Sequence, residues 1–358
     1  MSKKVLFLLP YPLHQAPSQR FRVEAYYNLL KQQGINFDTD VFLDEKAWSI
    51  LYQGGSSVQK AAAVVKGYLK RLVKIVFNAR AYDYIFVHRE AAPLGPPVFE
   101  WLLTKVFRKK VIYDFDDAIW IPSITESNKI ARYVKAFWKI SYICRWSSKI
   151  SAGNAFLAGW AKQYNPTVVI NPTCVDMEAR FNRIKTPAEG QKIVIGWTGS
   201  HSTLKYLDKV YPVLQRLERE FTFEFLVICN QPPSFTLNSL RFIKWQEATE
   251  IEDLLKIDIG IMPLVADAWS EGKCGFKLIQ YLSLGIPCVA SPVGVNKDIV
   301  KDGRNGFLCE TEEEWYLAIK QLLINNSLRK EMGLAGREKM LREYSIKSNA
   351  ANFLSFFS

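Results

Sequence analysis

The feature that most constrains the fold of this chain is a double series of short apolar runs, each followed by an amphipathic stretch. In the first half the runs lie at 5–9, 84–87, 110–113 and 168–170, with helical patterns at 21–33, 57–77 and 129–145. Short continuous apolar runs are typical of buried parallel strands, and their alternation with helices predicts βαβ units. We therefore expect an α/β fold with a doubly wound sheet in this half.

A second series follows a polar stretch at 176–191 that contains Pro187 and Gly190. Its strand runs lie at 193–197, 223–229, 240–245, 258–264 and 287–293, and its helical patterns at 203–219, 249–256, 276–284, 312–325 and 327–342. The pattern predicts two Rossmann-like domains, 1–178 and 192–342, joined by a linker at 179–191. A last helix at 343–358 is expected to pack back on the first domain through Phe353, Phe356 and Phe357. Two such sheets would face each other across a ligand-binding cleft.

Positive charge is concentrated in the first half. Residues 1–150 hold 23 Lys and Arg against 12 Asp and Glu, whereas the remaining 208 residues hold 24 against 23. The stretches 60–80 and 129–149 each carry six basic residues and no acidic one. A basic amphipathic helix either keeps its apolar side in the core or lies on an anionic membrane. The combined charge favours an anionic membrane surface as partner; no recognised nucleic-acid module is present, and nucleic acid is not expected.

The six cysteines form no CxxC pair and have no zinc-type spacing with histidine, so we predict reduced thiols and no metal site. No apolar run reaches the ~20 residues that a membrane-spanning helix needs. The expected location is cytoplasmic, with the option of a peripheral position on the inner face of the membrane.

The segment 267–296 is the most informative for function. It reads as strand, Gly-containing loop, helix, Gly-Ile-Pro turn and strand, with Gly272 and Gly275 in the loop and Lys273 and Lys277 flanking the helix start. Unpaired N–H groups at a helix start, together with two ammonium groups, favour a diphosphate. The alternative is that the lysines are solvated and the glycines only turn the chain.

This segment resembles the donor-site signature of retaining glycosyltransferases of family 4, which have the GT-B fold. The helix, the run Gly285-Ile286-Pro287-Cys288-Val289-Ala290-Ser291 and Gly294 match that signature, and the runs at 302–308 and 169–176 match two further motifs of the family in the right order. The resemblance implies a nucleotide-sugar-binding second domain, an acceptor-side first domain, a nucleotide-diphosphate sugar as co-substrate and no required metal. It also implies front-face attack in which the leaving diphosphate helps to deprotonate the acceptor.

The chain departs from the family at both glutamates of the Glu-x7-Glu pair. Gln280 stands at the second position, where its amide can still bond the ribose, and Gly272 stands at the first. Glu271, one residue early, is the substitute that we expect at the donor sugar, with Asp267 as a weaker candidate. The family's phosphate-binding Arg and Lys are missing near 196–203, and we expect Lys273 and Lys277 to replace them.

Further donor contacts are expected where other strands of the second domain end. Ser200, Ser202 or Thr203 fit a phosphate contact, and Ser202 or Thr203 also fits a helix N-cap. Trp245 fits either a base platform or a core or edge position. The predicted donor-binding residues are Gly199, Ser200, Trp245, Glu271, Lys273, Cys274, Gly275, Phe276, Lys277 and Gln280.

In the first domain, polar residues follow three apolar runs. Tyr11, Ser18, Arg20 and Arg22 are predicted to bind donor phosphate or acceptor, or else the arginines are ordinary surface residues. His88, Asp116 and Asp117 are the predicted catalytic residues, with the two aspartates binding acceptor or stabilising charge. Two alternatives remain open at this point, namely salt bridges to the many lysines of this half and a metal site at Asp114-Phe115-Asp116.

The function expected from the resemblance is transfer of a sugar, with retention, from a nucleotide-diphosphate sugar to a glycan or lipid-linked glycan in cell-surface polysaccharide synthesis. Two alternatives use the same fold. One is a non-catalytic nucleotide-sugar-binding protein, favoured by the missing glutamates, and the other is a nucleotide-sugar epimerase.

Overall fold

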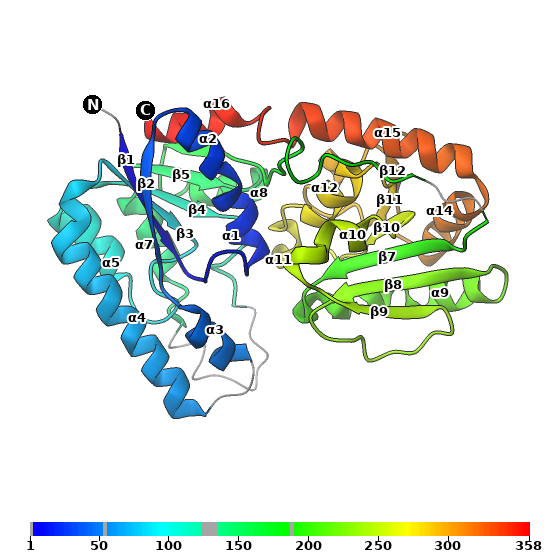
Figure 1. The fold of residues 1–358 in the computed structure, drawn as a ribbon, viewed down its shortest axis with the longest axis horizontal. Helices are drawn as coiled ribbons and strands as arrows, with labels where there is room; N and C mark the ends of the chain where they lie inside the picture. Colours follow the sequence, from blue (N-terminus) through cyan, green and yellow to red (C-terminus); the bar gives the residue numbers. More distant parts are fainter. Residues whose placement is uncertain (1–2, 53–55, 123–134, 187–189) are drawn as a thin grey trace. The chain divides into compact units, whose positions relative to one another are not determined.

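The chain folds into two compact units. The computed structural model describes residues 3–52, 56–122, 135–186 and 190–358 (Figure 1). One unit comprises residues 1–173 together with 350–358, and the other comprises residues 174–349. The unit boundary therefore falls at Thr173 and again at Ala350, whereas the sequence pattern placed it in the polar stretch after 178 and at 343.

The first unit is built on a six-stranded parallel sheet in the order β2-β1-β3-β4-β5-β6. The strands are β1 Lys4–Leu9, β2 Asn36–Val41, β3 Tyr84–His88, β4 Lys110–Phe115, β5 Lys149–Ala152 and β6 Val168–Ile170. All four strands predicted in this half are confirmed. Two were not predicted, since β2 is a half-exposed edge strand with four polar residues and β5 has only four residues.

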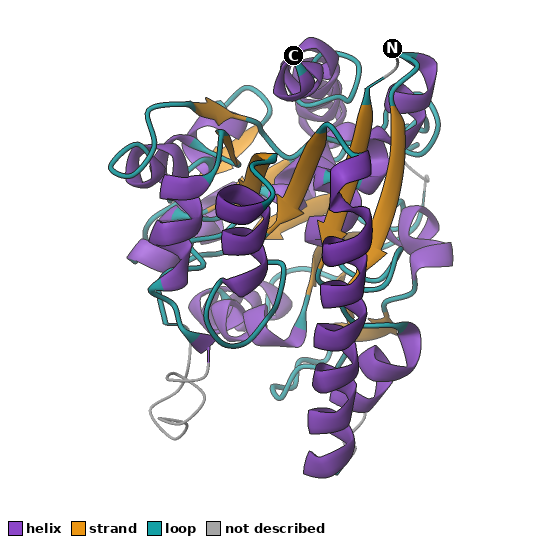
Figure 2. Ribbon diagram, turned by 90° about the vertical axis from the view of Figure 1, so that its left-hand side faces the viewer, coloured by secondary structure: helices purple, strands orange, loops and turns teal. Residues whose placement is uncertain are grey.

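Helices cover both faces of this sheet (Figure 2). They are α1 Pro17–Arg22, α2 Tyr27–Gln32, α3 Glu45–Tyr52, α4 Ser57–Asn78, α5 Val98–Trp101, α7 Lys139–Trp146, α8 Ala155–Ala161 and α16 Ala350–Leu354. The helix predicted at 57–77 is confirmed as α4. A capping box formed by Ser56 and Gln59 stabilises its start. The helix predicted at 129–145 is confirmed only over its last part, since 129–134 lie outside the described residues.

The C-terminal segment completes the core of the first unit. Phe353, Phe356 and Phe357 are fully buried. The Phe353 ring stacks on that of Tyr26 with centroids 3.8 Å apart, and the Phe357 ring meets that of Phe7 edge-on at 6.3 Å. Burying three aromatic side chains supplies several kcal/mol, which is enough to hold a short helix that would not form alone.

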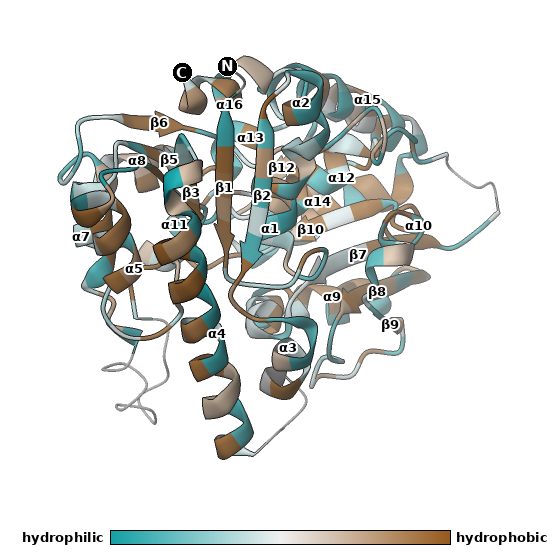
Figure 3. Cartoon of the chain, turned by 60° about the vertical axis from the view of Figure 1, so that its left-hand side comes forward, coloured by the Kyte–Doolittle hydropathy of each residue, from teal (hydrophilic) through white to brown (hydrophobic). Residues whose placement is uncertain are grey.

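Helix α4 presents an apolar stripe to solvent, contrary to the simpler expectation that its apolar side lies in the core. Val65, Leu69, Leu72 and Val76 are 55, 60, 40 and 42% exposed (Figure 3). The buried side of the helix consists instead of Gly67, Arg71 and Ile75. Gly67 is needed there because a Cβ would lie 2.7 Å from the Phe42 ring. Within the described part of the chain, no helix has both the length and the apolar character to cross a bilayer.

The second unit is also built on a six-stranded parallel sheet, in the order β12-β11-β10-β7-β8-β9. Its strands are β7 Ile193–Gly199, β8 Phe223–Cys229, β9 Leu240–Lys244, β10 Ile259–Met262, β11 Cys288–Ala290 and β12 Gly306–Leu308. Its helices are α9 Tyr211–Glu218, α10 Glu250–Leu254, α11 Ala268–Glu271, α12 Phe276–Ser283, α13 Asn296–Ile299, α14 Glu312–Ile324 and α15 Asn326–Glu343. The five strands predicted in this half and the α/β class with two Rossmann-like domains are confirmed.

The two faces of the second sheet are covered differently. On one face Leu214 of α9 and Trp315 of α14 share a core with Val227 of β8. On the other face α12 lies against β10, where a Cβ on Gly260 would overlap the Tyr281 ring. Helix α15 packs on α12 in turn. This arrangement fixes the start of α12 at the carboxyl edge of the sheet.

The contact between α15 and α12 yields a stability prediction. Gly333, in the interior of α15, approaches the Gly285 turn so closely that a Cβ would overlap the Gly285 carbonyl oxygen. We expect Gly333→Ala to lower the free energy of unfolding by about 1–3 kcal/mol, measured by chemical denaturation, although alanine favours a helix interior. Gly159→Ala in α8 is the matched control, because no heavy atom lies within 4 Å of its Cβ position. Equal effects of the two substitutions would contradict the packing argument.

Candidate functional site

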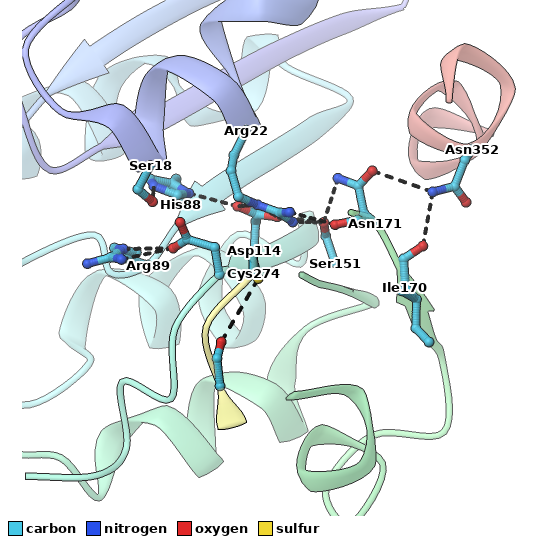
Figure 4. Close-up of polar contacts among 12 residues, drawn as sticks. Ser18, Arg22, His88, Arg89, Asp114, Ser151, Ile170, Asn171, Cys274 and Asn352 are labelled. Carbon is cyan, nitrogen blue, oxygen red and sulfur yellow. Dashed lines mark hydrogen bonds and ion pairs between the residues drawn. The ribbon is translucent and has the colours of Figure 1, made fainter. Parts of the chain in front are cut away.

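A chain of hydrogen bonds crosses the carboxyl edge of the first sheet. The Ser18 Oγ lies 2.9 Å from His88 Nε2, and His88 Nδ1 lies 2.7 Å from Asp114 Oδ2 (Figure 4). Ser18 comes from the start of α1, His88 ends β3, and Asp114 lies near the end of β4. The side chains of His88 and Asp114 are fully buried, while Ser18 is only half-buried. This is the residue order and geometry of a proton relay.

Arg22 anchors this chain from the protein side. Its guanidinium pairs with both oxygens of Asp114, donates to the Asn171 carbonyl oxygen at 2.5 Å and donates to Ser151 Oγ at 3.1 Å. Arg22 is 1% exposed. The prediction that Arg22 meets an external phosphate is therefore wrong for this arrangement, because its donors point into the protein. The anion that Arg22 meets is instead a buried carboxylate of the same unit.

The charge state of Asp114 follows from these contacts. Burial alone would raise the pKa of Asp114, but Arg22 and His88 outweigh it and hold the pKa below the usual range. Asp114 is therefore an anion near neutral pH. Ser151 adds a hydrogen bond to the same carboxylate at 2.5 Å.

Arg89 holds the two aspartates that follow β4. Its side chain donates to Asp116 Oδ1 at 2.9 and 3.1 Å and also pairs with Asp117. Arg89 has a φ of 60°, a left-handed conformation that is costly for a residue with a side chain. Burial would raise the pKa of Asp116, but Arg89 lowers it well below its usual range. The strained backbone thus serves to place a cation between two carboxylates.

These ion pairs bear on the metal alternative. Asp114 and Asp116 are each paired with a different arginine. Among the residues that the structure describes, no group of three or more His, Cys, Asp and Glu side chains could hold a metal. Both aspartates of the Asp-x-Asp sequence form salt bridges, as the salt-bridge alternative predicted. Their partners are arginines, whereas that alternative expected lysines.

Tyr11 and Arg20 lie next to the same edge. The Tyr11 ring packs on Trp48 with centroids 5.0 Å apart, and burial raises the pKa of its hydroxyl despite the nearby Arg89. Arg20 is 4% exposed and its guanidinium lies 5.0 Å from the Phe21 ring centroid. Neither is an ordinary surface residue, and a phosphate or acceptor contact for them stays a prediction.

In the second unit, the predicted phosphate loop is organised by Gly275. This residue caps the start of α12 with a φ of 65°, and a Cβ there would overlap Ile299. Gly275 is thus required by the turn and by packing, and it leaves the first N–H groups of α12 at the carboxyl edge of the sheet. Gly294 has a similar role, since its Cβ would lie 2.9 Å from the Glu271 carbonyl oxygen.

Lys277 joins this helix start to the end of β7. Its ammonium lies 5.2 Å from the centroid of the buried Trp197 ring. A Cβ on Gly199 would lie 2.9 Å from Lys277 Cε, so the glycine makes room for the lysine. Lys273 lies beside a second indole ring, with its ammonium 4.8 Å from the Trp269 ring centroid. Both lysines are half-buried and held against indole rings, which contradicts the view that they are merely solvated.

The remaining loop residues differ in exposure. Gln280 is 3% exposed and Cys274 is 8% exposed, whereas Glu271 and Phe276 are half-buried. Asp267 caps α11 by accepting from the Ser270 backbone N–H at 2.7 Å, so its carboxylate has a structural role. Of the two substitutes considered for the missing glutamate, Glu271 is thus the better placed.

The hydroxyl-rich loop after β7 starts a 3-10 helix at His201–Lys209. Its N-cap residue is Ser200, so the N-cap predicted at Ser202 or Thr203 is wrong by two or three residues. Ser200 makes no side-chain cap bond; its Oγ lies 2.9 Å from that of Ser202 on the surface. Asn230, which sequence reasoning missed, holds the loop by accepting from the His201 N–H at 2.8 Å.

Trp245 belongs to a different contact network. Its indole N–H donates to Glu250 at 3.2 Å, and Glu250 also pairs with Arg180 at 2.8 Å. Its base-binding role therefore stays a prediction, with a structural partner now identified. The structure brings Gly199, Lys277 and the start of α12 together. Trp245 follows the carboxyl end of the edge strand β9, two strands away from β7.

Several residues of these sites had no clear sequence signal. Arg89 and Ser151 are single polar residues whose role depends on strands far apart in the sequence. Trp197 reads as a core tryptophan, which it is, and only the fold shows that its ring also supports Lys277. The one available signal was Asp114 itself, which lies within an apolar strand run. Because an unpaired carboxylate inside a sheet is costly, its presence there indicates a buried cationic partner.

Comparison with known proteins agrees with this architecture. Residues 180–339 match the family model described as glycosyl transferases group 1, which covers most of the second unit. A curated relative, N-acetyl-alpha-D-glucosaminyl L-malate synthase of Bacillus anthracis, is 23% identical over 167 residues, 44% of this chain. The matched part spans 42% of the length of that relative.

Two solved structures resemble the whole chain. Sucrose-phosphate synthase from Thermosynechococcus elongatus has a TM-score of 0.70 at 11% identity, covering 100% of this chain and 98% of that one. Anabaena HepE, determined in complex with UDP and glucose, has a TM-score of 0.64 at 16% identity, covering 99% of each chain. The chain therefore has the GT-B fold of these neighbours, and residues 180–339 of its second unit are similar to group 1 glycosyl transferases.

The buried pair of Arg22 and Asp114 gives a prediction on stability. Removing one partner of a buried ion pair leaves an uncompensated charge, so Arg22→Met should lower the free energy of unfolding by about 3–5 kcal/mol. Arg145→Met on the exposed side of α7 is the control. Because the folded pKa of Asp114 is lowered, its stabilising contribution is present above the unfolded pKa of about 4 and is lost as pH falls below it. Denaturation of wild type between pH 7 and pH 3 should show this loss, and its absence would contradict the ion-pair account.

Proposed function

We propose that the protein is a glycosyltransferase that moves a sugar, with retention, from a nucleotide-diphosphate sugar to a glycan or lipid-linked glycan of the cell surface. The observation that carries this proposal is the start of α12, where Lys273 and Lys277 bring two positive charges to the left-handed turn at Gly275. The group 1 match over 180–339 and the GT-B fold support it.

Each donor contact has a physical reason. Lys273 and Lys277 balance the diphosphate charge and stabilise it as it leaves, a task that a metal ion performs in other transferases. We therefore propose that no metal is needed. Gln280 bonds the ribose through its amide, and Glu271 contacts the donor sugar in place of the usual glutamate. The HepE complexes make UDP the first nucleotide to test.

The alternatives are a binding protein without catalysis and an epimerase. The buried Gln280 in place of a glutamate favours the first, since it removes a carboxylate from the donor site. The second is represented among the structural neighbours by a putative UDP-N-acetylglucosamine 2-epimerase from Listeria monocytogenes, with a TM-score of 0.58 at 13% identity. Turnover separates all three: transfer to an acceptor, no reaction, or conversion of the free nucleotide sugar.

The donor site is tested by calorimetric titration with UDP, GDP and their sugar conjugates, with EDTA and with Mg²⁺. We expect one nucleotide to bind equally well in both conditions, and Lys277→Met and Lys273→Met each to weaken binding about tenfold through loss of a cation at the phosphates. Lys192→Met, an exposed lysine before the start of β7, is the matched control. Metal-dependent binding, or binding unaffected by both loop lysines, would refute the assignment.

We also propose that the protein rests on the cytoplasmic face of an anionic membrane through α4. Four apolar side chains on α4 are 40–60% exposed, and Lys66, Lys70 and Lys74 lie along the same helix. Trp101 of α5 and Trp138 before α7 are 45 and 55% exposed, and aromatic side chains of this kind favour the headgroup region. Apolar burial and charge attraction together favour an interfacial helix.

The membrane proposal predicts co-sedimentation with vesicles containing phosphatidylserine, weakened by salt. Leu69→Glu should reduce the bound fraction several-fold, since it places a charge in the apolar stripe and repels the anionic lipid. Leu317→Glu on α14 is the control, because Leu317 is 54% exposed in the second unit. The idea fails if neither neutral nor anionic vesicles retain the protein at low salt, or if both variants bind like wild type.

A further inference from the structure

Three aromatic side chains of the first unit form a stack that is only partly covered by protein. This group, the aromatic platform, consists of Trp120, Phe156 and Trp160. The ring of Trp120 lies on that of Trp160, with centroids 3.9 Å apart and 4° between the ring planes. The Phe156 ring is also close to parallel with that of Trp120, at a centroid distance of 6.2 Å and an angle of 21°. Two separate segments of the chain thus contribute nearly parallel rings to one surface.

Both segments of the platform begin where a strand of the sheet ends. Trp120 lies in the turn after β4, where the Ile119 N–H donates to the Asp117 carbonyl oxygen at 2.8 Å. Phe156 and Trp160 lie one helical turn apart on α8, which follows β5. Because β4 and β5 are parallel neighbours, their carboxyl ends lie at the same edge of the sheet. The platform therefore occupies the edge at which parallel α/β sheets bind ligands.

The stack is anchored to the core on one side and open on the other. Phe115 is fully buried and meets the rings of Trp120 and Trp160 edge-on, at centroid distances of 6.1 and 6.4 Å. Phe156, in contrast, is 39% exposed, and both tryptophans are half-buried. Rigid aromatic rings that are held from behind and remain accessible are a surface that a flat, partly apolar ligand can cover.

Charged side chains lie beside the platform in the same turn. Asp116 and Asp117 follow β4 directly, and their side chains are 12 and 17% exposed. Both are held in place by Arg89, which is 20% exposed. A carboxylate accepts several hydrogen bonds, so each aspartate can accept from a ligand hydroxyl while it stays paired with Arg89. The turn after β4 thus combines aromatic faces with fixed hydroxyl acceptors.

We infer that the aromatic platform, together with Asp116 and Asp117, binds a pyranose ring of the acceptor glycan. One side of a pyranose presents C–H groups, which suit the negative face of an aromatic ring, and its rim presents hydroxyls, which suit carboxylates. A lipid chain would cover the rings without using the carboxylates, and a nucleotide phosphate would be repelled by them. The role of this sugar as acceptor rests on the proposed function, whereas its binding needs only residues of the first unit.

Binding is tested by saturation-transfer NMR on the full chain, with the methyl pyranosides of glucose, galactose, mannose and N-acetylglucosamine as probes. Glycerol is the control ligand, since it has hydroxyls but no ring face. We expect at least one pyranoside to bind, with the strongest saturation at its ring C–H groups, and glycerol not to bind. Trp120→Ala should weaken this binding about tenfold, whereas Trp120→Phe should retain most of it because an aromatic face remains. Phe156→Ala, at the exposed end of the stack, should weaken it several-fold.

Trp146→Ala is the matched control for these variants. Trp146 is also a half-buried tryptophan, but it ends α7 before β5 begins and so lies at the opposite edge of the sheet. Circular dichroism checks the fold of each variant. The inference is overturned if no pyranoside binds to wild type, or if Trp120→Ala and Phe156→Ala both bind it as tightly as wild type does. Failure of the proposed function gives a different result, in which a pyranoside binds through the platform but no nucleotide sugar is bound or transferred to it.

Discussion

The first unit depends on one buried ion pair, that of Arg22 and Asp114. Both side chains are fully buried, so each charge is costly unless the other is present. The pair also satisfies its neighbours: Arg22 donates to Asn171, whose side chain bonds Ser151. Asn352 in the C-terminal segment donates to the Ile170 carbonyl oxygen next to it (Figure 4). A helix, three strands and the end of the chain are thus tied to one charge pair.

The same pair sets the chemistry at the sheet edge. Since Arg22 fixes the position of Asp114, the orientation of the His88 ring follows, and the hydroxyl of Ser18 lies beside that ring. Arg89 performs the corresponding task for Asp116 and Asp117 outside the sheet. Polar residues at the strand ends therefore form two layers, one fully buried around Asp114 and one partly exposed around Arg89. A buried network of this kind is stable only when all its members are satisfied.

The sequence predicts the frame of this protein better than its sites. Strands with continuous apolar runs, such as β1 and β8, and the capped helix α4 follow from local pattern. The edge strand β2 does not, because its polarity reflects exposure that only the assembled sheet defines. The turn at Gly275 before α12 followed from local pattern, and its binding of phosphate stays a prediction. The partner of Asp114 did not, because Arg22 lies 92 residues away in the sequence and its burial contradicts the usual expectation for arginine.

The excess positive charge of the first half has two physical fates. Arg22, Arg71 and Lys139 are buried and form ion pairs with Asp114, Asp40 and Glu90, respectively. These cations form part of the core and contribute little to the electric field at the surface. The net charge of the sequence therefore overstates the positive charge that a binding partner would meet. What distinguishes α4 is the combination of surface lysines with a stripe of exposed apolar side chains. Charge alone attracts any anion, but an apolar stripe loses its unfavourable contact with water only against another apolar surface, which a nucleic acid backbone does not offer and the proposed lipid bilayer does.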